Sequence, residues 1–382
     1  MYSVSAYGKM IADDIRTAAY VEALRATVRP GCTVIDIGAG TGILAFIACE
    51  LGARKVYAIE PDDAIGLARD IARDNNVADR ICFIQGLSTK IALPERADVI
   101  VSDLRGVLPL FQQHLPSIID ARARLLAPGG ALIPKQDRVW AAVIDAPQSY
   151  GRLVKPWKVQ GFSFKMDRAR ELETNTWGKL RGTPDKFLTE PQCWTSIDYE
   201  TITSANIANT LAWKVTQAGL AHGFVVWFDS VLTDGCGFSN KPGLPELIYG
   251  SAFFPWSRPV QVELDDAVSI RLRADLIGTD YVWTWETEVV GASTGTMTAR
   301  FRQSTFSGIP LSLQSLQKRA NHYVPVLNDN GRIDLHILNL MNSGMCVEEI
   351  ARTVRQEFPG VLLSDREARV RVGNLSEKYD RS

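Results

Sequence analysis

The part of the sequence best suited to hold a ligand is a glycine-rich turn at residues 38–42, Gly-Ala-Gly-Thr-Gly. It lies between a short apolar run, residues 34–37, and a segment with helical spacing, residues 43–51. Glycines between a strand and a helix let a ligand approach the backbone, and the helix N-terminus offers unpaired N–H groups. A carboxylate at Glu60, where the next apolar run ends, is suited to accept two ribose hydroxyls. The alternative is a turn with only a structural role.

The spacing of the glycines separates two classes of cofactor. The dinucleotide fingerprint needs a third glycine three residues after the second, and Ile43 occupies that position. The spacing is instead similar to that of the loop that carries S-adenosylmethionine in class I methyltransferases. This resemblance implies S-adenosylmethionine as the cofactor and methyl transfer as the reaction.

Several segments resemble a narrower family, the protein arginine methyltransferases. The matching segments are residues 10–17 with Tyr20, residues 40–44, residues 52–56, residues 59–60 and residues 102–106. The resemblance spans residues 7–305. It implies that Arg16 pairs with the methionine carboxylate, that Met10 packs near the sulfonium and that Glu60 binds the ribose. The cofactor-binding residues that it implies are Tyr7, Met10, Arg16, Asp36, Gly38, Gly40, Thr41, Gly42, Glu60, Pro61, Ser88 and Thr89. For Arg16, a surface salt bridge is the alternative.

The acceptor pocket departs from the family, which clamps a guanidinium between two glutamates. The corresponding positions are Asp103 and Gln112, and Arg105 adds a cation between them. We expect these three residues to form a changed catalytic pocket, in which Asp103 takes up a proton or holds an N–H or O–H group. Arg105 would bind an anionic group of the substrate. The alternatives are a helix cap or loop residue for Asp103, an outward-facing Arg105 and a merely polar helix residue at Gln112.

Two histidines are further candidates for the pocket. His114 follows the active-site loop and could act as a base, and His222 lies near an apolar strand of the second region. For His222, a histidine satisfied at a sheet edge is the favoured interpretation. The expected protein is thus a methyltransferase acting on a peptide or small-molecule nucleophile, and a non-catalytic binding or regulatory protein is the alternative.

Composition narrows the class of protein. The 42 basic and 43 acidic residues leave a net charge of −1, which disfavours nucleic-acid binding. No apolar run approaches a membrane span, and Asp13 and Asp14 interrupt the start of the chain where a signal peptide would be apolar. The six cysteines have no metal-binding spacing. We therefore expect a cytoplasmic protein without a metal and without membrane contact.

The distribution of tryptophan and the hydrophobic period predict three regions. All nine tryptophans lie between Trp140 and Trp285. Residues 1–137 alternate apolar strands with helices, which predicts a doubly wound, Rossmann-like parallel sheet of the α/β class. Residues 138–309 show period-two alternation, which predicts an antiparallel β-barrel or sandwich. Residues 310–382 predict a small, mainly helical module.

The C-terminal module loosely resembles the small strand-plus-three-helix modules that bind leader peptides, and also a winged-helix fragment. The acidic pair Glu348 and Glu349, without a basic stripe, disfavours DNA contact. An appendage that packs against the rest of the chain is the favoured interpretation, with a peptide-binding module as the alternative.

The arm that grips the partner subunit in the resembled family has a counterpart in an insertion at residues 160–195. The insertion contains five large aromatic residues, Phe162, Phe164, Trp177, Phe187 and Trp194. An exposed loop seldom carries so much apolar surface. We therefore expect a homodimer.

Overall fold

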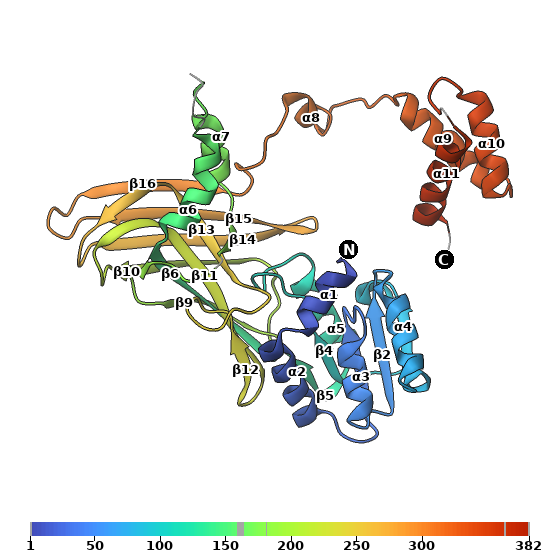
Figure 1. The fold of residues 1–382 in the computed structure, drawn as a ribbon, viewed down its shortest axis with the longest axis horizontal. Helices are drawn as coiled ribbons and strands as arrows, with labels where there is room; N and C mark the ends of the chain where they lie inside the picture. Colours follow the sequence, from blue (N-terminus) through green and yellow to red (C-terminus); the bar gives the residue numbers. More distant parts are fainter. Residues whose placement is uncertain (1, 159–163, 181, 363, 381–382) are drawn as a thin grey trace. The chain divides into compact units, whose positions relative to one another are not determined.

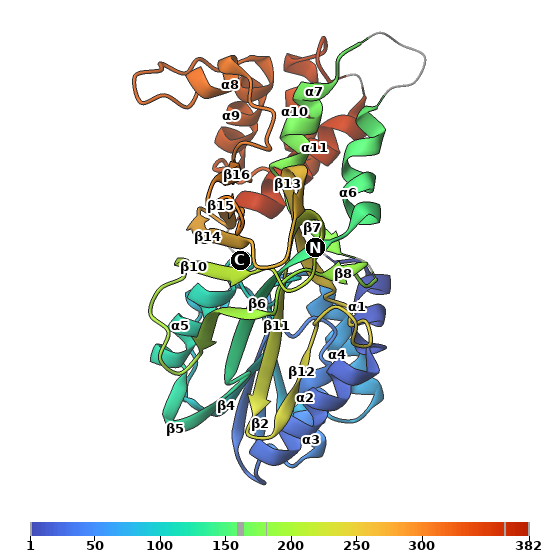
Figure 2. The same ribbon diagram turned by 90° about the vertical axis from the view of Figure 1, so that its left-hand side faces the viewer.

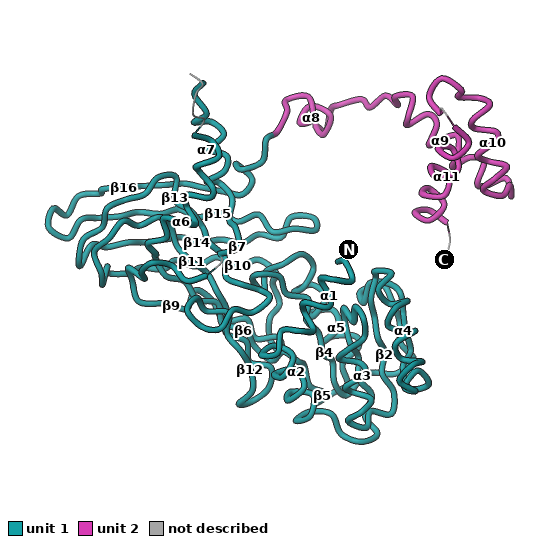
Figure 3. Tube along the Cα trace, viewed as in Figure 1, with its two compact units in different colours: residues 1–310 teal, residues 311–382 magenta. Residues whose placement is uncertain are grey.

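The computed structural model describes residues 2–158, 164–180, 182–362 and 364–380. The chain divides into two compact units, Met1–Pro310 and Leu311–Ser382 (Figure 3). The predicted boundary at residue 137 falls inside the first unit, and the division into three domains stays a prediction. Along the described parts of the chain, no helix combines the length and the apolar character needed to cross a bilayer.

The N-terminal part of the first unit is built on a five-stranded parallel sheet with strand order β3-β2-β1-β4-β5. The strands are β1 (Thr33–Ile37), β2 (Lys55–Glu60), β3 (Ile81–Gln85), β4 (Ala97–Ser102) and β5 (Leu126–Ile133). The helices are α1 (Val4–Ile11), α2 (Asp14–Thr27), α3 (Ile43–Glu50), α4 (Ala64–Asp74) and α5 (His114–Arg124). Figure 2 shows α5 on the opposite side of this sheet from α3 and α4. Every residue of β1 is buried, because helices cover both faces of a parallel sheet.

The order of the strands reverses between β1 and β4, which lie side by side. In open α/β sheets, ligands bind at such a reversal, outside the carboxyl ends of the strands. The glycine turn follows β1, and Asp103 follows β4. The fold therefore brings both predicted sites to the same edge of the sheet.

The rest of the first unit is built on two antiparallel sheets. One has the order β7-β13-β11-β6-β8, with β12 paired to β11 and β9 paired to β6, and the other has the order β10-β14-β15-β16. The first contains β6 (Gln136–Asp145), β7 (Gly178–Leu180), β8 (Lys186–Phe187), β9 (Gln192–Asp198), β11 (Gly219–Thr233), β12 (Cys236–Ser239) and β13 (Ser251–Val262). The second contains β10 (Ile207–Lys214), β14 (Ala267–Ile277), β15 (Asp280–Val290) and β16 (Met297–Ser304).

Aromatic residues fill the space between the two sheets. Phe254 of β13 contacts both Trp283 and Trp285 of β15, with ring centroids 5.3 Å apart in each pair. This aromatic core explains why tryptophan is confined to the second region of the sequence, and it confirms the predicted fold class.

The hairpin of β11 and β12 connects the β-sheets to the N-terminal part of the unit, because both strands pack against α2 (Figure 1). Its two strands come very close at Gly237, where a Cβ atom would lie 1.9 Å from the Ser230 carbonyl oxygen. A side chain at this position would push the strands apart. The hairpin thus carries residues of the second region to the edge of the parallel sheet.

The predicted dimerisation arm, residues 160–195, contains helix α7 (Asp167–Thr174) and the short strands that follow it, and helix α6 (Pro147–Val154) precedes it. Three of its five aromatic residues pack internally: Trp177 against Phe254, Phe187 against Trp227 and Trp194 against Trp283. These three rings therefore do not supply the apolar surface from which the dimer is expected, because they pack against other rings of the β-sheets. Phe164 is exposed, and Phe162 lies outside the described residues.

The second unit has helices α8 (Leu313–Gln317), α9 (Asp329–Met341), α10 (Val347–Glu357) and α11 (Asp365–Tyr379). Helices α9 to α11 share a small core of their own that includes Ile337, Val354 and Val372. The described residues of this unit contain no strand, so the structure shows the helices of the predicted module without its strand. Residues 324–327 form an irregular segment in which all three non-proline side chains are exposed.

Candidate functional site

The glycine turn takes a backbone conformation that requires glycine. Gly38, Gly40 and Gly42 have φ angles of 75°, 52° and 89°, in the left-handed region that side chains with a Cβ atom rarely adopt. A Cβ atom on Gly38 would lie 2.4 Å from Leu104, and one on Gly40 would lie 2.6 Å from the ring of Tyr7. The N-terminal helix α1 and the loop after β4 therefore both lie directly against this turn.

Glu60 is held against the turn by two backbone hydrogen bonds. One carboxylate oxygen accepts from Gly40 N and the other from Asp62 N, each at 2.9 Å. The side chain is buried, and burial raises the pKa of Glu60. Each oxygen still has a lone pair, so the carboxylate is oriented and able to accept two further hydrogen bonds.

Asp36 supplies a second buried carboxyl group next to the turn. Its Oδ2 accepts from Ala45 N at 3.1 Å, whereas its Oδ1 has no hydrogen-bond partner. Burial raises the pKa of Asp36 to about 7, and the nearby charge of Glu60 adds to the shift. A buried carboxylate oxygen without a partner needs a hydrogen-bond donor, and a bound polar ligand is one source of such a donor.

The remaining predicted cofactor residues lie at different depths. Thr41 and Ser88 are buried, Tyr7 and Met10 are half-buried, and Pro61 and Thr89 are exposed. Of these, Tyr7 touches the glycine turn. Met10 contributes its carbonyl oxygen, which accepts a hydrogen bond from Arg16 Nη1 at 3.3 Å.

Asp103 lies at the centre of a buried cluster of polar groups. Its Oδ2 accepts from Arg16 Nε at 2.6 Å and from the Tyr249 hydroxyl at 2.5 Å, and its Oδ1 accepts from Arg105 Nε at 3.1 Å. Burial alone would raise the pKa of Asp103, but the two guanidinium groups outweigh burial and lower it to about 2. Asp103 is therefore a fixed anion near neutral pH and a poor general base. The predicted alternatives of a helix cap and a solvated loop residue do not describe it.

Arg105 points inward and its side chain is fully buried. Besides Asp103, it donates to Asp137 at 3.0 Å, to the Ser230 hydroxyl at 2.6 Å and to the Tyr20 hydroxyl. Burial would lower the pKa of Arg105, but the carboxylate of Asp137 outweighs that effect and raises it. The structure thus contradicts both expectations for Arg105: the side chain neither faces outward nor offers an open cation to a substrate anion. The reason is that Asp137 and Asp103 already neutralise it.

The cluster extends from Asp137 to His114. The Tyr199 hydroxyl lies 2.5 Å from Asp137 Oδ2 and 2.9 Å from His114 Nε2. Burial lowers the pKa of His114 to about 3, and the charge of Arg105 adds to this effect. A neutral, buried histidine that contacts a tyrosine fits a role in packing better than the predicted role of a base.

Two other predicted residues lie away from this cluster. Gln112 is exposed and has a φ angle of 42°, in a turn that precedes α5 rather than within the helix. His222 is buried on β11, and its Nδ1 lies 3.1 Å from Asp145 Oδ1, at the end of β6, and accepts from Ala146 N at 3.3 Å. The favoured interpretation of His222 as a satisfied histidine agrees with these contacts.

Sequence reasoning missed the residues that surround Arg105. Asp137 and Ser230 belong to strands β6 and β11, Tyr199 follows β9, and no motif singles these residues out. Tyr249 had a signal, because residues 249–251 stand where the resembled family has a Thr-His-Trp loop. Within the described residues, no group of histidine, cysteine and acidic side chains is arranged to hold a metal ion.

The chain is similar to known methyltransferases in sequence. Residues 15–146 match the family model described as ribosomal protein L11 methyltransferase. Over 234 residues the chain is 31% identical to a probable protein arginine N-methyltransferase 6 of Arabidopsis thaliana, with 59% of this chain and 54% of that protein covered. It is 28% identical over 284 residues to protein arginine N-methyltransferase 6 of Xenopus tropicalis, with 70% and 82% covered. The chain spans about half the length of the first curated relatives it matches.

Two solved structures share the fold. Protein arginine methyltransferase 10 of Arabidopsis thaliana has a TM-score of 0.69 at 23% identity, with 79% of this chain and 97% of that chain covered. The Trypanosoma brucei PRMT1 enzyme–prozyme heterotetrameric complex with AdoHcy has a TM-score of 0.70 at 24% identity, with 78% and 97% covered. The predicted resemblance to protein arginine methyltransferases is confirmed.

Proposed function

We propose that this protein is an S-adenosylmethionine-dependent methyltransferase whose acceptor pocket differs from that of the arginine methyltransferases it resembles. The observation that carries the proposal is Glu60, whose carboxylate is oriented by Gly40 N beside a glycine turn in the left-handed conformation. A solved neighbour is named as a complex with AdoHcy, which supports this choice of cofactor. A cytoplasmic location, expected from the sequence, remains part of the proposal.

The cofactor site fits the residues that surround the glycine turn. Glu60 would accept the ribose hydroxyls, and the unpartnered oxygen of Asp36 would accept from a donor on the cofactor. Arg16 lies at the same edge and retains N–H groups beyond those that bond Asp103 and Met10, so it can also bind a carboxylate. When bound, the cofactor supplies a methyl group on a sulfonium. The protein's own part is to orient the acceptor and to exclude water, since α1 covers the turn.

The cofactor site can be tested through Glu60. Calorimetric titration with S-adenosylhomocysteine should show binding to the wild type and a loss of about 1–3 kcal/mol in Glu60→Ala, because two hydroxyls lose a buried acceptor. Glu60→Gln, which keeps one oxygen, should fall between the two. Glu50→Ala removes an exposed carboxylate on α3 and should bind as the wild type does. Absent wild-type binding, or equal affinity in Glu60→Ala, contradicts the proposed site.

The acceptor that we propose is a neutral nucleophile on a peptide or a small molecule. The carboxylate of Asp103 and the guanidinium groups of Arg16 and Arg105 leave no uncompensated negative charge next to β4. A pocket of this kind has no electrostatic attraction for a second guanidinium.

A non-catalytic binding or regulatory role is the second candidate. The observation that favours it is the complete engagement of Asp103 by Arg16, Arg105 and Tyr249. One solved neighbour is named as a complex of an enzyme with a prozyme. Tight cofactor binding without any methylated product, in a screen of peptides and metabolites, distinguishes this role from catalysis.

We also propose that the protein forms a homodimer through the arm at residues 160–195, which contains α7. Figure 1 shows α7 projecting beyond the β-sheets. A heterotetrameric neighbour supports assembly through the shared fold. Sedimentation at micromolar concentration should give twice the mass of the chain, and dilution should lower it. A species with the mass of one chain throughout this range argues against the dimer.

A further inference from the structure

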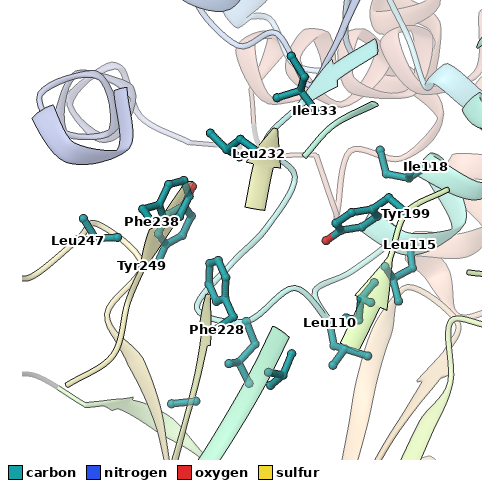
Figure 4. Packing of buried hydrophobic residues seen from close by; sticks show 14 of the residues in the cluster. Leu110, Leu115, Ile118, Ile133, Tyr199, Phe228, Leu232, Phe238, Leu247 and Tyr249 are labelled. Atoms are coloured by element: carbon teal, nitrogen blue, oxygen red, sulfur yellow. The ribbon is translucent and has the colours of Figure 1, made fainter. Parts of the chain in front are cut away.

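The guanidinium of Arg105 lies inside a cage of aromatic rings. Its Cζ atom is 5.3 Å from the ring centroid of Phe238, 5.4 Å from that of Phe228, 5.8 Å from that of Tyr249 and 5.9 Å from that of Tyr20. Figure 4 shows Phe228, Phe238 and Tyr249 gathered on one side, with Tyr199 across from them. All four cage rings lie within the distance at which an aromatic face attracts a cation.

Two carboxylates complete the cage. Asp103 accepts from Nε of Arg105, and Asp137 accepts from Nη1, so the two acids contact different edges of the planar fork. The Ser230 hydroxyl also accepts from Nη1, and the Tyr20 hydroxyl accepts from Nη2. Aromatic faces together with carboxylates at hydrogen-bonding distance form the chemistry that recognises a guanidinium rather than an ammonium.

The walls of the cage come from both halves of the first unit. Tyr20 belongs to α2 in the N-terminal part, whereas Phe228, Phe238 and Asp137 belong to β11, β12 and β6 of the first antiparallel sheet. These side chains also have contacts other than Arg105 that hold them in position. Tyr20, for example, also donates to the carbonyl oxygen of Ser102 at 2.9 Å, and Tyr249 also bonds Arg16. The cage is therefore a binding site in its own right, with a side chain of the same protein as its ligand.

We propose that this cage is a guanidinium-binding site that the chain fills permanently with Arg105. The inference rests on the proposed function, because a filled site next to β4 would keep an acceptor guanidinium out. Its physical content is independent of catalysis. A small guanidinium compound should bind wherever the Arg105 side chain has been removed, because Asp137 and the four rings would remain in place.

The test uses the full chain with Arg105→Ala, which removes the side chain beyond Cβ, and ethylguanidinium, which replaces the atoms removed. Millimolar ethylguanidinium should raise the melting temperature of Arg105→Ala by at least about 3 °C in a saturable manner, and calorimetry should show one site. Ethylammonium, with the same charge but no planar fork, should have no such effect. Neither compound should stabilise the wild type or Arg271→Ala, which removes an exposed arginine of β14.

Each outcome decides the inference. If Arg105→Ala is unfolded alone but folds with ethylguanidinium, as followed by circular dichroism, the cage is confirmed. A folded variant that ignores ethylguanidinium, an equal response to ethylammonium, or a variant that stays unfolded with both overturns it. S-Adenosylhomocysteine is titrated separately into the wild type. If the wild type does not bind S-adenosylhomocysteine but ethylguanidinium still stabilises Arg105→Ala, the proposed cofactor site is rejected and the guanidinium site is retained.

Discussion

Arginine-rich peptides are expected to receive little or no label when they are offered to the wild-type protein with labelled S-adenosylmethionine. A guanidinium that leaves water needs compensating carboxylates, because an unpaired buried charge costs several kcal/mol. The one carboxylate after β4, Asp103, is already bonded to Arg16 at 2.6 Å and to Arg105 at 3.1 Å. Loss of even one charge-assisted pair weakens binding by about 1.5–3 kcal/mol, which corresponds to a decrease of about ten- to a hundred-fold.

The same assay should offer free amino acids and small acids beside the peptides. It is repeated with Gln112→Glu and Arg105→Met, singly and combined, since these changes add a carboxylate and remove the cation. Arg302→Met, an exposed position on β16, serves as the control. Gain of arginine methylation in the double variant alone would assign acceptor choice to these two positions. Robust labelling of arginine peptides by the wild type would show that the charge argument is wrong.

The buried pair of Arg105 and Asp137 should make a large contribution to measured stability when one partner is removed. Both side chains are fully buried, and their atoms lie 3.0 Å apart. Asp137→Leu leaves the guanidinium without its main counter-charge and should lower the free energy of unfolding by about 3–5 kcal/mol. Urea titration followed by tryptophan fluorescence measures this change.

Matched variants separate the ion pair from general disruption. Asp70→Leu breaks an exposed pair with Arg73 on α4 and should change stability by about 1 kcal/mol or less. The double variant Arg105→Met with Asp137→Leu should be more stable than the sum of the single effects, because neither charge is left alone. Additive single effects, or a loss in Asp137→Leu no larger than in Asp70→Leu, would contradict the role of the pair.

The features that depend on neighbouring residues could be predicted from the sequence. The glycine turn is local, because a strand, three glycines and a helix follow one another within residues 33–50. Their left-handed φ angles are accessible to glycine at little cost, so residue type and spacing suffice to predict the turn. The parallel sheet is predicted equally well, since strands buried on both faces are continuously apolar. Period-two alternation predicts the antiparallel strands of the second region in the same way.

Residues whose surroundings come from distant segments could not be predicted. Arg105 reads as a cation in a loop, and only the folded chain brings it to Ser230, 125 residues away, and to Tyr20, 85 residues away. The internal packing of the aromatic residues in the arm could not be predicted for the same reason. Trp177, for example, meets its partners Phe254 and Trp283 only when the sheets close.

The sequence by itself thus determined the cofactor turn, the alternation of elements and the types of side chain at the acceptor site. The tertiary structure decided the charge state of that site, because charge compensation depends on which groups lie within a few ångströms after folding. Asp103 shows the difference: alone it is a carboxylate suited to hold an acceptor or a proton. Between Arg16 and Arg105, with its pKa lowered to about 2, it is a neutralised anion. The charge environment of Asp103 is therefore set by long-range packing, which residue spacing does not encode.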